Sequence, residues 1–354
     1  MQVYFLQAYH GDAIWITYHD EKATPRNILI DGGPTATYGE KDKKGKIEPG
    51  VLAETIEYIR DKGQKIDLLI LTHVDNDHIQ GVLAWFEEDL KATELIEKVW
   101  FNSGKLIFEY FKVRDIVENH IQLSPSEDTD TAIKEGVTFE KVIKAANICD
   151  EKIIKQGCTI DLLGVTFKII SPDENGLSAL LHKWEKKEPE SLTAVAKDYK
   201  ISLVDHIKAD RYAKDPSVHN GSSIAFILSF KRKNMLFLSD AHPEKAIDGL
   251  KHFGYTKENP LACEFVKIAH HGSKYNTKYE LLELFNAPIY VISSDGSDHS
   301  PYKQCLARLI NAKNKLGIYF NYPELAKQIF FQDDFDAFPD LSIVTADHKF
   351  IINE

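Results

Sequence analysis

Short apolar segments separated by turns dominate the beginning of the chain, and longer amphipathic segments follow them. Residues 3–5 and 13–18 are predicted to be strands joined by a turn at residues 9–12, and residues 27–31 a third strand. We expect later strands at residues 68–71, 99–101, 158–163, 165–170, 223–230, 235–239, 265–268 and 289–293. Early hairpins followed by strands that alternate with helices favour an α/β (α+β) fold, in which two packed sheets are flanked by helices in αββα layers.

Amphipathic helices are predicted between these strands. Apolar positions over residues 51–59 and 82–86 place a helix on each side of the strand at 68–71. Two further helices are expected at residues 107–121 and 131–146. The segment from residue 176 to about residue 216 is charged and mostly helical in pattern.

One large domain is expected over residues 1–322, with helical insertions near 102–156 and 176–218. Residues 323–354 are expected to form a C-terminal extension that packs on this domain. Within the extension, the segments at 328–332 and 343–352 would add edge strands.

The composition is that of an ordinary water-soluble protein. Hydrophobic residues make up 43% of the 354 positions and charged residues 27%, and the net charge is −11. This charge argues against a broad basic surface for duplex nucleic acid, but it leaves room for a nucleotide or a short strand. We find no basic leader and no long apolar run, so we expect a cytoplasmic protein with no membrane partner. Four unpaired cysteines are expected to be reduced, namely Cys149, Cys158, Cys263 and Cys305.

Residues 68–81 carry the strongest chemical signal. The first four of these residues are apolar and predict a buried strand, and two histidines and two aspartates follow within six residues. In extended backbone His73, Asp75 and Asp77 would share one face. Crowded carboxylates and imidazoles repel or stay unsatisfied unless a positive charge lies between them. We therefore predict a divalent metal bound by His73, Asp75, Asp77 and His78, in preference to an ordinary polar loop.

The spacing resembles the His-x-His-x-Asp-His signature of the metallo-β-lactamase-fold hydrolases, with Asp75 in place of the second histidine. This version is similar to the hydrolase domain of the competence (DNA-uptake) proteins and to their free-standing relatives. The turn Asp31-Gly32-Gly33 resembles the one that closes the third strand of this fold. The resemblance implies a metallo-β-lactamase αββα sandwich of two mixed sheets. It also implies a two-metal site, and one loop rarely completes such a site.

The resemblance implies further ligands at the ends of later strands. Asp240 follows the expected strand at 235–239, where the family has an aspartate that bridges both metals. His299 resembles the histidine before proline that follows the last core strand. It would bind the second metal beside Asp77 and His78.

The element His270-His271-Gly272-Ser273 resembles a feature of the competence-type hydrolases. Adjacent residues of an extended chain point to opposite sides, so we expect at most one of the two histidines to face the metals. That histidine resembles a residue that protonates the leaving group in nucleases of this fold. The implied catalytic residues are Asp77 and either His270 or His271, and Ser273 is a candidate substrate contact.

The third ligand of the first metal is left open between two residues. Enzymes of this fold place a histidine before the strand expected here at 223–230, and this turn offers His219 or Asn220. Asparagine matches the competence-type relatives, which makes Asn220 a candidate substrate contact and His219 a candidate ligand. Three other polar residues are interpreted as local turn or cap groups, namely His10, Asp12 and His242.

The implied chemistry is hydrolysis. Two divalent ions, zinc or manganese, roughly 3.5–4 Å apart would hold a bridging hydroxide that attacks phosphorus or carbon. Asp75 makes the first site more anionic, which favours manganese or magnesium over zinc. We predict a metal-dependent hydrolase of phosphodiester bonds, with a nucleic acid or nucleotide as substrate. The alternatives are a hydrolase of lactones, thioesters or other carboxylic esters, and a binding protein with a degenerate site.

Overall fold

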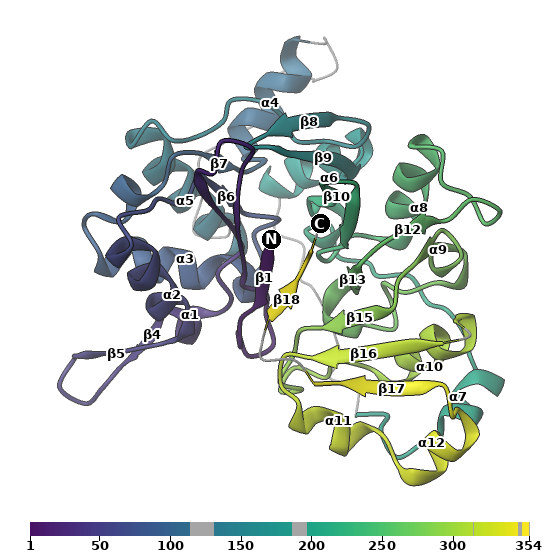
Figure 1. Ribbon diagram of the computed structural model, residues 1–354. Helices are drawn as coiled ribbons and strands as arrows, with labels where there is room; N and C mark the ends of the chain where they lie inside the picture. Colours follow the sequence, from purple (N-terminus) through teal and green to yellow (C-terminus); the bar gives the residue numbers. More distant parts are fainter. Residues whose placement is uncertain (114–130, 186–196, 314, 346–348, 354) are drawn as a thin grey trace.

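The computed structural model describes residues 1–113, 131–185, 197–313, 315–345 and 349–353, which form two large mixed sheets (Figure 1). The six-stranded sheet, in the order β18-β1-β2-β3-β6-β7, consists of β1 (Gln2–Phe5), β2 (Ile14–His19), β3 (Pro25–Ile30), β6 (Leu68–Ile70), β7 (Val99–Trp100) and β18 (Lys349–Ile351). The eight-stranded sheet, in the order β17-β16-β15-β13-β11-β10-β9-β8, consists of β8 (Thr159–Leu162), β9 (Val165–Ser171), β10 (Ala225–Phe230), β11 (Lys233–Phe237), β13 (Phe265–Lys267), β15 (Ile289–Ile292), β16 (Leu316–Phe320) and β17 (Leu341–Val344).

Apolar side chains from both sheets meet in one buried core between them. Phe5 of β1 packs edge-on against Phe265 of β13, with their ring centroids 5.4 Å apart. Strand β6 divides its side chains between two cores, because successive residues of a strand point to opposite faces. Leu68 and Ile70 join the core between the sheets, and Leu69 joins the core beneath the helices.

Helices cover the outer face of each sheet and complete the αββα layers, which confirms the predicted fold class. The core outside the six-stranded sheet includes residues of α2 (Val51–Asp61), α3 (Asn76–Glu88), α4 (Gly104–Val113), α5 (Thr131–Ala145) and α6 (Glu174–Glu185). The core outside the eight-stranded sheet includes residues of α7 (Leu203–Lys208), α8 (Pro243–His252), α9 (Tyr279–Leu282), α10 (Lys303–Ala312) and α11 (Glu324–Ile329), and α12 (Gln332–Ala337) packs against it. Shorter elements are α1 (Thr35–Tyr38), η1 (Ala92–Leu95), η2 (Asn220–Ser222) and η3 (Ala269–Gly272), and two small ladders pair β4 (Gly39–Lys41) with β5 (Ile47–Pro49) and β12 (Leu261–Ala262) with β14 (Phe285–Asn286).

The C-terminal part differs from the prediction in two places. Residues 328–332, expected as an edge strand, instead contain the end of α11 and the start of α12. Strand β16 was not predicted, although all five of its residues are buried. The apolar segment at 343–352 does contribute edge strands, because β17 and β18 each lie at one edge of a sheet.

The proposed division into residues 1–322 and 323–354 stays a prediction, as do the insertions near 102–156 and 176–218. Part of the helix expected at 107–121 and part of the second insertion lie outside the described residues. Within the described ranges, no helix is both long and apolar enough to span a bilayer.

The two sheets repeat one pattern of five strands. In the first sheet β1, β2 and β3 are antiparallel neighbours, and β3, β6 and β7 are parallel. In the second sheet β9, β10 and β11 are antiparallel neighbours, and β11, β13 and β15 are parallel. The C-terminal ends of β3 and β6 therefore lie at the same end of the strands as the N-terminal end of β2. The C-terminal ends of β11 and β13 likewise lie at the same end of the strands as the N-terminal end of β10.

Replacing Phe226 by alanine should lower the free energy of unfolding by about 3–5 kcal/mol, because truncation leaves a cavity in the core between the sheets. Leu90→Ala is the control, since Leu90 is 95% exposed, and it should change stability by less than about 0.5 kcal/mol. Urea denaturation of both variants measures the difference. Equal losses in the two variants would contradict the assignment of Phe226 to this core.

Candidate metal centre

Asp31, at the end of β3, organises the loop that follows β6. Its carboxylate accepts hydrogen bonds from the backbone N–H of Thr72 (2.8 Å) and from the Thr72 hydroxyl (2.7 Å), and it lies 2.8 Å from Nδ1 of His78. Because the carboxylate can only accept, His78 donates through Nδ1 and keeps Nε2 for a metal. The Thr72 hydroxyl lies 3.0 Å from Nδ1 of His73 and accepts from it in the same way. Both imidazoles therefore present Nε2.

Helix α3 positions the aspartate and histidine that end the motif. Asp75 is its N-cap residue, and Asp77 and His78 lie in its first turn. The helix approaches the turn after β3 so closely that a Cβ atom on Gly81 would lie 2.0 Å from the carbonyl oxygen of Gly32. Glycine at position 81 thus lets the motif dock against the end of β3.

The other half of the cluster comes from the second sheet. Asp240 follows β11, and His270 and His271 follow β13. Both histidines have left-handed backbone, with φ of 47° and 52°, so the chain turns tightly there. The Nε2 atom of each lies 3.7 Å from Oδ2 of Asp240. The prediction that at most one of them faces the site is therefore wrong, because it assumed extended backbone.

Polar partners hold these two rings in place. Nδ1 of His271 donates to the carbonyl oxygen of Ser293 at 2.8 Å. Nδ1 of His270 lies 2.9 Å from Oδ1 of Asn276. Each ring is thereby oriented with Nε2 towards the centre, as is usual for histidines that bind metals.

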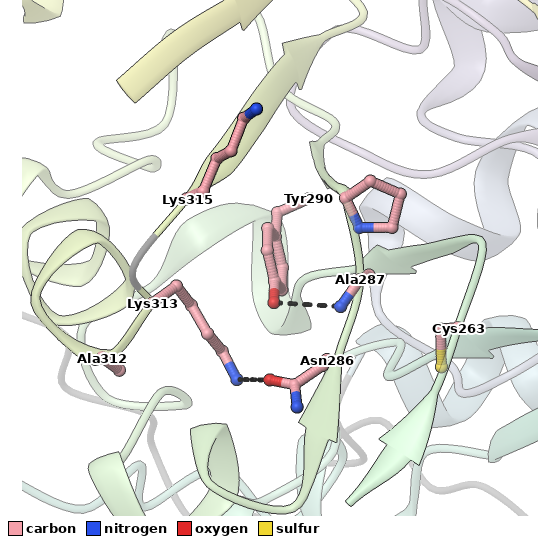
Figure 2. A pocket seen from close by; sticks show the side chains of 8 residues that line it. Cys263, Asn286, Ala287, Tyr290, Ala312, Lys313 and Lys315 are labelled. Carbon is pink, nitrogen blue, oxygen red and sulfur yellow. Dashed lines mark hydrogen bonds between the residues drawn. The ribbon is translucent and has the colours of Figure 1, made fainter. Parts of the chain in front are cut away.

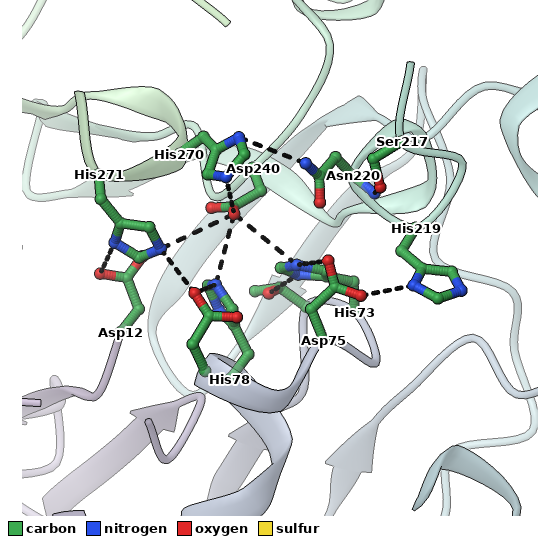
Figure 3. Close-up of polar contacts among 12 residues, drawn as sticks. Asp12, His73, Asp75, His78, Ser217, His219, Asn220, Asp240, His270 and His271 are labelled. Carbon is green, nitrogen blue, oxygen red and sulfur yellow. Dashed lines mark hydrogen bonds and ion pairs between the residues drawn. The ribbon is translucent and has the colours of Figure 1, made fainter. Parts of the chain in front are cut away.

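Oδ2 of Asp240 is the centre of the cluster (Figure 3). Four Nε2 atoms surround it, those of His78 at 3.5 Å, His270 and His271 at 3.7 Å, and His73 at 3.8 Å. These contacts are longer than hydrogen bonds. They are close to the separation of about 3.4 Å between two ligands of one tetrahedral ion with bonds of about 2.1 Å.

Several of these atoms are buried without a hydrogen-bond partner. They are Nε2 of His73, His78 and His271, and Oδ1 of Asp240. Buried polar atoms are nearly always satisfied by protein or water, so their convergence indicates a cation. The residues present therefore fit a metal centre.

Two further carboxylates divide the cluster into two groups beside Asp240. Oδ2 of Asp75 lies 3.6 Å from Nε2 of His73. Oδ2 of Asp77 lies 3.2 Å from Nε2 of His271 and 3.6 Å from Nε2 of His78. One group is thus a histidine with an aspartate, and the other is an aspartate with two histidines.

His219 and Asn220 lie next to this cluster, just before β10. Nδ1 of His219 is 2.5 Å from Oδ1 of Asp75, which makes His219 a partner of a candidate ligand. Asn220 donates from Nδ2 to Asp215 at 2.8 Å, and Nδ2 lies 3.3 Å from Nδ1 of His270. The roles of His219 as a third ligand and of Asn220 as a substrate contact stay predictions.

For two predicted site residues, the described part of the chain gives no side-chain hydrogen bond or ion pair to the cluster. His299 is half-buried in the loop after β15, and no hydrogen bond or ion pair of the described residues links it to the cluster. The imidazole beside Asp77 is that of His271 instead. Ser273 is 2% exposed and its hydroxyl accepts from the N–H of Tyr275 at 3.2 Å, and its role as a substrate contact stays a prediction.

Asp12 was interpreted as a turn group, but the structure brings it into the cluster. One ligand atom of Asp12 and one each of His78, Asp240 and His271 all lie within 4.8 Å of one another. The missing signal was topological. Asp12 precedes β2, which runs antiparallel to β3, so it lies at the same edge as the motif after β6.

Protons on the histidines provide the countercharge in the metal-free cluster. Burial lowers the pKa of His78, but the carboxylates of Asp240 and Asp77 outweigh it and raise this pKa well above its ordinary value. Burial also lowers the pKa of His270, and Asp240 and Asp215 outweigh it and raise the pKa to about 10. Imidazolium groups therefore occupy the positions where metal cations would compensate the same carboxylates.

Metal-free protein should lose stability as the pH rises from about 6.5, the pKa of histidine in an unfolded chain, to about 10, the folded-state pKa of His270. A raised folded-state pKa stabilises fully below the unfolded-state value, and the contribution disappears as the folded group deprotonates. His270→Gln should make the decline shallower. Thermal unfolding in chelator over this pH range measures both slopes, and parallel slopes would contradict the assignment.

A separate hollow lies at the opposite ends of the same strands (Figure 2). Its lining includes Cys263, which precedes β13, and Pro288, which precedes β15, whereas the cluster follows these strands. The ammonium of Lys313 donates to the carbonyl oxygens of Leu282 and Phe285. These bonds join the ends of structural elements, and the hollow has no part in the metal cluster.

The chain is similar in sequence to known proteins. The sequence model of the metallo-beta-lactamase superfamily matches residues 16–144. ComE operon protein 3 of Bacillus subtilis (strain 168) is 22% identical over 307 residues, which are 84% of this chain and 29% of that protein. The chain thus spans less than a third of the length of this relative.

The fold is also similar to those of known structures. The metallo-beta-lactamase fold protein YhfI from Bacillus subtilis aligns over 99% of this chain and 98% of its own, with a TM-score of 0.41 and 9% identity. Zinc-bound PqqB from Methylobacterium extorquens aligns over 99% and 100%, with a TM-score of 0.44 and 11% identity. The superfamily match and the two-sheet architecture show that the chain has the metallo-β-lactamase fold, and this match supports a metal-dependent hydrolase.

Proposed function

We propose that the chain is a two-metal hydrolase of phosphodiester bonds, acting on a nucleotide or on a single strand of nucleic acid. The observation that carries this proposal is the central carboxylate of Asp240, which has a group of candidate ligands on each side. Two divalent cations bound there would supply a water of lowered pKa and would neutralise charge on the attacking and leaving oxygens. The net charge of −11 favours a substrate held at the metals over one gripped by a broad basic surface.

The ligand set suits manganese as well as zinc. Asp75 occupies a position where the family signature has an imidazole, which makes the first group richer in oxygen. Carboxylate oxygens favour harder ions, and imidazole suits zinc. We infer that the protein accepts both ions and that manganese supports the higher activity.

His270 is the imidazole that a substrate can reach. Its side chain is 27% exposed, whereas those of His73 and His78 are fully buried and that of His271 is 3% exposed. His271, beside Asp77, is therefore assigned as a ligand of the second metal. His270 is assigned as the group that gives a proton to the leaving oxygen.

The surroundings of His270 fix which of its nitrogens can do this. Asn276 donates from Nδ2 to Asp215 at 2.8 Å and to the carbonyl oxygen of Asp240 at 3.2 Å, so its Oδ1 is the atom left to face His270. His270 therefore donates through Nδ1 and is held with Nε2 towards the centre. Asp215, 3.5 Å from Nδ1, stabilises the protonated ring.

The reaction is tested with protein loaded with manganese or with zinc. We expect hydrolysis of bis(p-nitrophenyl) phosphate and of single-stranded or cyclic nucleotides, faster than that of any lactone or thioester. Asp240→Ala should lose both metals and all activity, because it removes the shared carboxylate. Elemental analysis and initial rates measure both effects. A folded wild-type protein without metal would contradict the two-metal proposal, and faster turnover of a lactone or thioester would favour the carboxylic-ester alternative.

Alanine substitutions of the two adjacent histidines should have different effects on metal content and turnover. His270→Ala should keep both metals and lose about a hundred- to ten-thousand-fold in turnover of a natural diester, the usual contribution of general acid catalysis. The loss should be smaller with p-nitrophenolate, a leaving group that needs little protonation. His271→Ala should instead lower metal content. Metal content and both rates are compared in the two variants, and loss of a metal from His270→Ala would place His270 among the ligands.

A further inference from the structure

Asp12 is a buried carboxylate whose second oxygen has no hydrogen-bond partner. The residue is 2% exposed, and its Oδ2 lies 2.9 Å from the ammonium of Lys267, which is itself 1% exposed. Oδ1 is buried and unpartnered, and it lies 3.7 Å from Nδ1 of His271. One oxygen is thus occupied by an ion pair, and the other is unpartnered and lies beside Nδ1 of His271, the nitrogen that donates to Ser293.

The loop that carries Asp12 is held firmly against the metal motif. The N–H of Asp12 donates to the carbonyl oxygen of Asp77 at 3.2 Å. The hydroxyl of Ser293, at the end of β15, donates to the carbonyl oxygen of Gly11 at 3.1 Å. A Cβ atom on Gly11 would lie 1.9 Å from the carbonyl oxygen of Asp77, so only glycine permits this approach. Both sheets therefore fix the position of Asp12.

The distances suit a common ion. The ligand atoms of Asp12, His78, Asp240 and His271 lie within 4.8 Å of one another. Two ligands on opposite sides of one ion, each bonded at about 2.2 Å, are about 4.4 Å apart. Neighbouring ligands of one tetrahedral ion are closer, about 3.6 Å apart, so the four atoms would draw together by up to about 1.2 Å to share one cation.

The repeat of strands in the two sheets points to the same assignment. Asp12 precedes β2, the strand before β3, and Asn220 precedes β10, the strand before β11. Asp12 lies two residues before β2 and Asn220 five residues before β10, so each lies in the segment that leads into the antiparallel strand next to β3 or β11. One has a ligand atom within 4.8 Å of those of His78, Asp240 and His271, and the other lies beside His270.

We propose that Asp12 is a further ligand of the second metal, binding through Oδ1, with Lys267 as the fixed countercharge on its other oxygen. The inference rests on the proposed function, because it requires metal ions at the centre of the cluster. It adds a carboxylate oxygen to the group of Asp77, His78 and His271. This second site is then harder than two imidazoles and one carboxylate would make it, which favours manganese.

Titration of chelator-stripped protein with Mn²⁺ alone tests the proposal. Wild-type protein should bind two ions per chain. Asp12→Asn should weaken one of them by more than about 100-fold, beyond the 10- to 100-fold typical of a residue that only supports a ligand, and should leave the other within about threefold. Isothermal titration measures both affinities, and circular dichroism verifies folding.

Asp12→Asn also leaves the buried ammonium of Lys267 without a countercharge, so a second variant separates the two effects. The double variant Asp12→Asn/Lys267→Met removes both charges and should regain thermal stability without regaining the lost ion. Lys267→Met alone keeps the ligand and should weaken Mn²⁺ by less than about 100-fold. Asp67→Asn is the matched control, because it breaks the 2.7 Å pair with Arg26 at the start of β6, remote from the cluster, and should keep both ions.

The outcomes distinguish this inference from the function on which it rests. Wild-type protein that binds no Mn²⁺ would overturn the two-metal proposal and this inference together. Two ions in wild-type protein and a loss of less than about 100-fold in the double variant would overturn the role of Asp12 alone. Recovery of the second ion in the double variant would do the same, since it would show that Lys267 without its countercharge caused the loss.

Discussion

The burial of the Asp240 carboxylate among four imidazoles is the constraint on which the rest of the site depends. A buried carboxylate is costly unless positive charge compensates it. The four rings can surround it because each is held by its own partner, and these partners are Asp31 for His78, Thr72 for His73, Asn276 for His270 and the carbonyl oxygen of Ser293 for His271. Asp31, Thr72 and Ser293 follow strands of the two sheets, and Asn276 lies in the loop between η3 and α9. The aromatic core between the sheets therefore sets the geometry of the metal centre as well as the stability of the fold.

Most of the fold could be predicted from local patterns, and the failures have physical causes. Short apolar segments bounded by turn residues were enough to place β2, β3 and β6, because most of their residues are buried and the turns mark where each strand stops. Strand β16 is buried at all five positions and lies after a helix, so it has no alternation to reveal it. Residues 328–332 form a short apolar segment, and such a segment can belong to a helix or to a strand. In the folded protein they include the end of α11 and the start of α12.

The candidate site could be predicted where its residues are neighbours in sequence, and less well where topology brings them together. Sequence spacing alone was enough to predict the group of His73, Asp75, Asp77 and His78. The orientation of His270 and His271 depends on positive φ at both residues, which no spacing rule contains. Asp12 reaches the cluster through the antiparallel pairing of β2 with β3, so its role requires the sheet order as well as the residue type.

The corresponding aspartates of the two sheets show how one position acquires different functions. Asp31 directly follows β3 and Asp240 lies three residues after β11, so each lies in the segment after the third strand of the repeated pattern. Two donors of Thr72 and one of His78 satisfy the oxygens of Asp31, so it can only orient a ligand. Oδ1 of Asp240 has no protein partner, and its Oδ2 faces imidazole nitrogens at distances too long for hydrogen bonds, so it remains available to cations. The number of protein donors around a buried carboxylate thus separates a supporting residue from a ligand. One oxygen of Asp12 is paired with Lys267, and the other has no partner. By this criterion Asp12 is a ligand, and Lys267 supplies its countercharge.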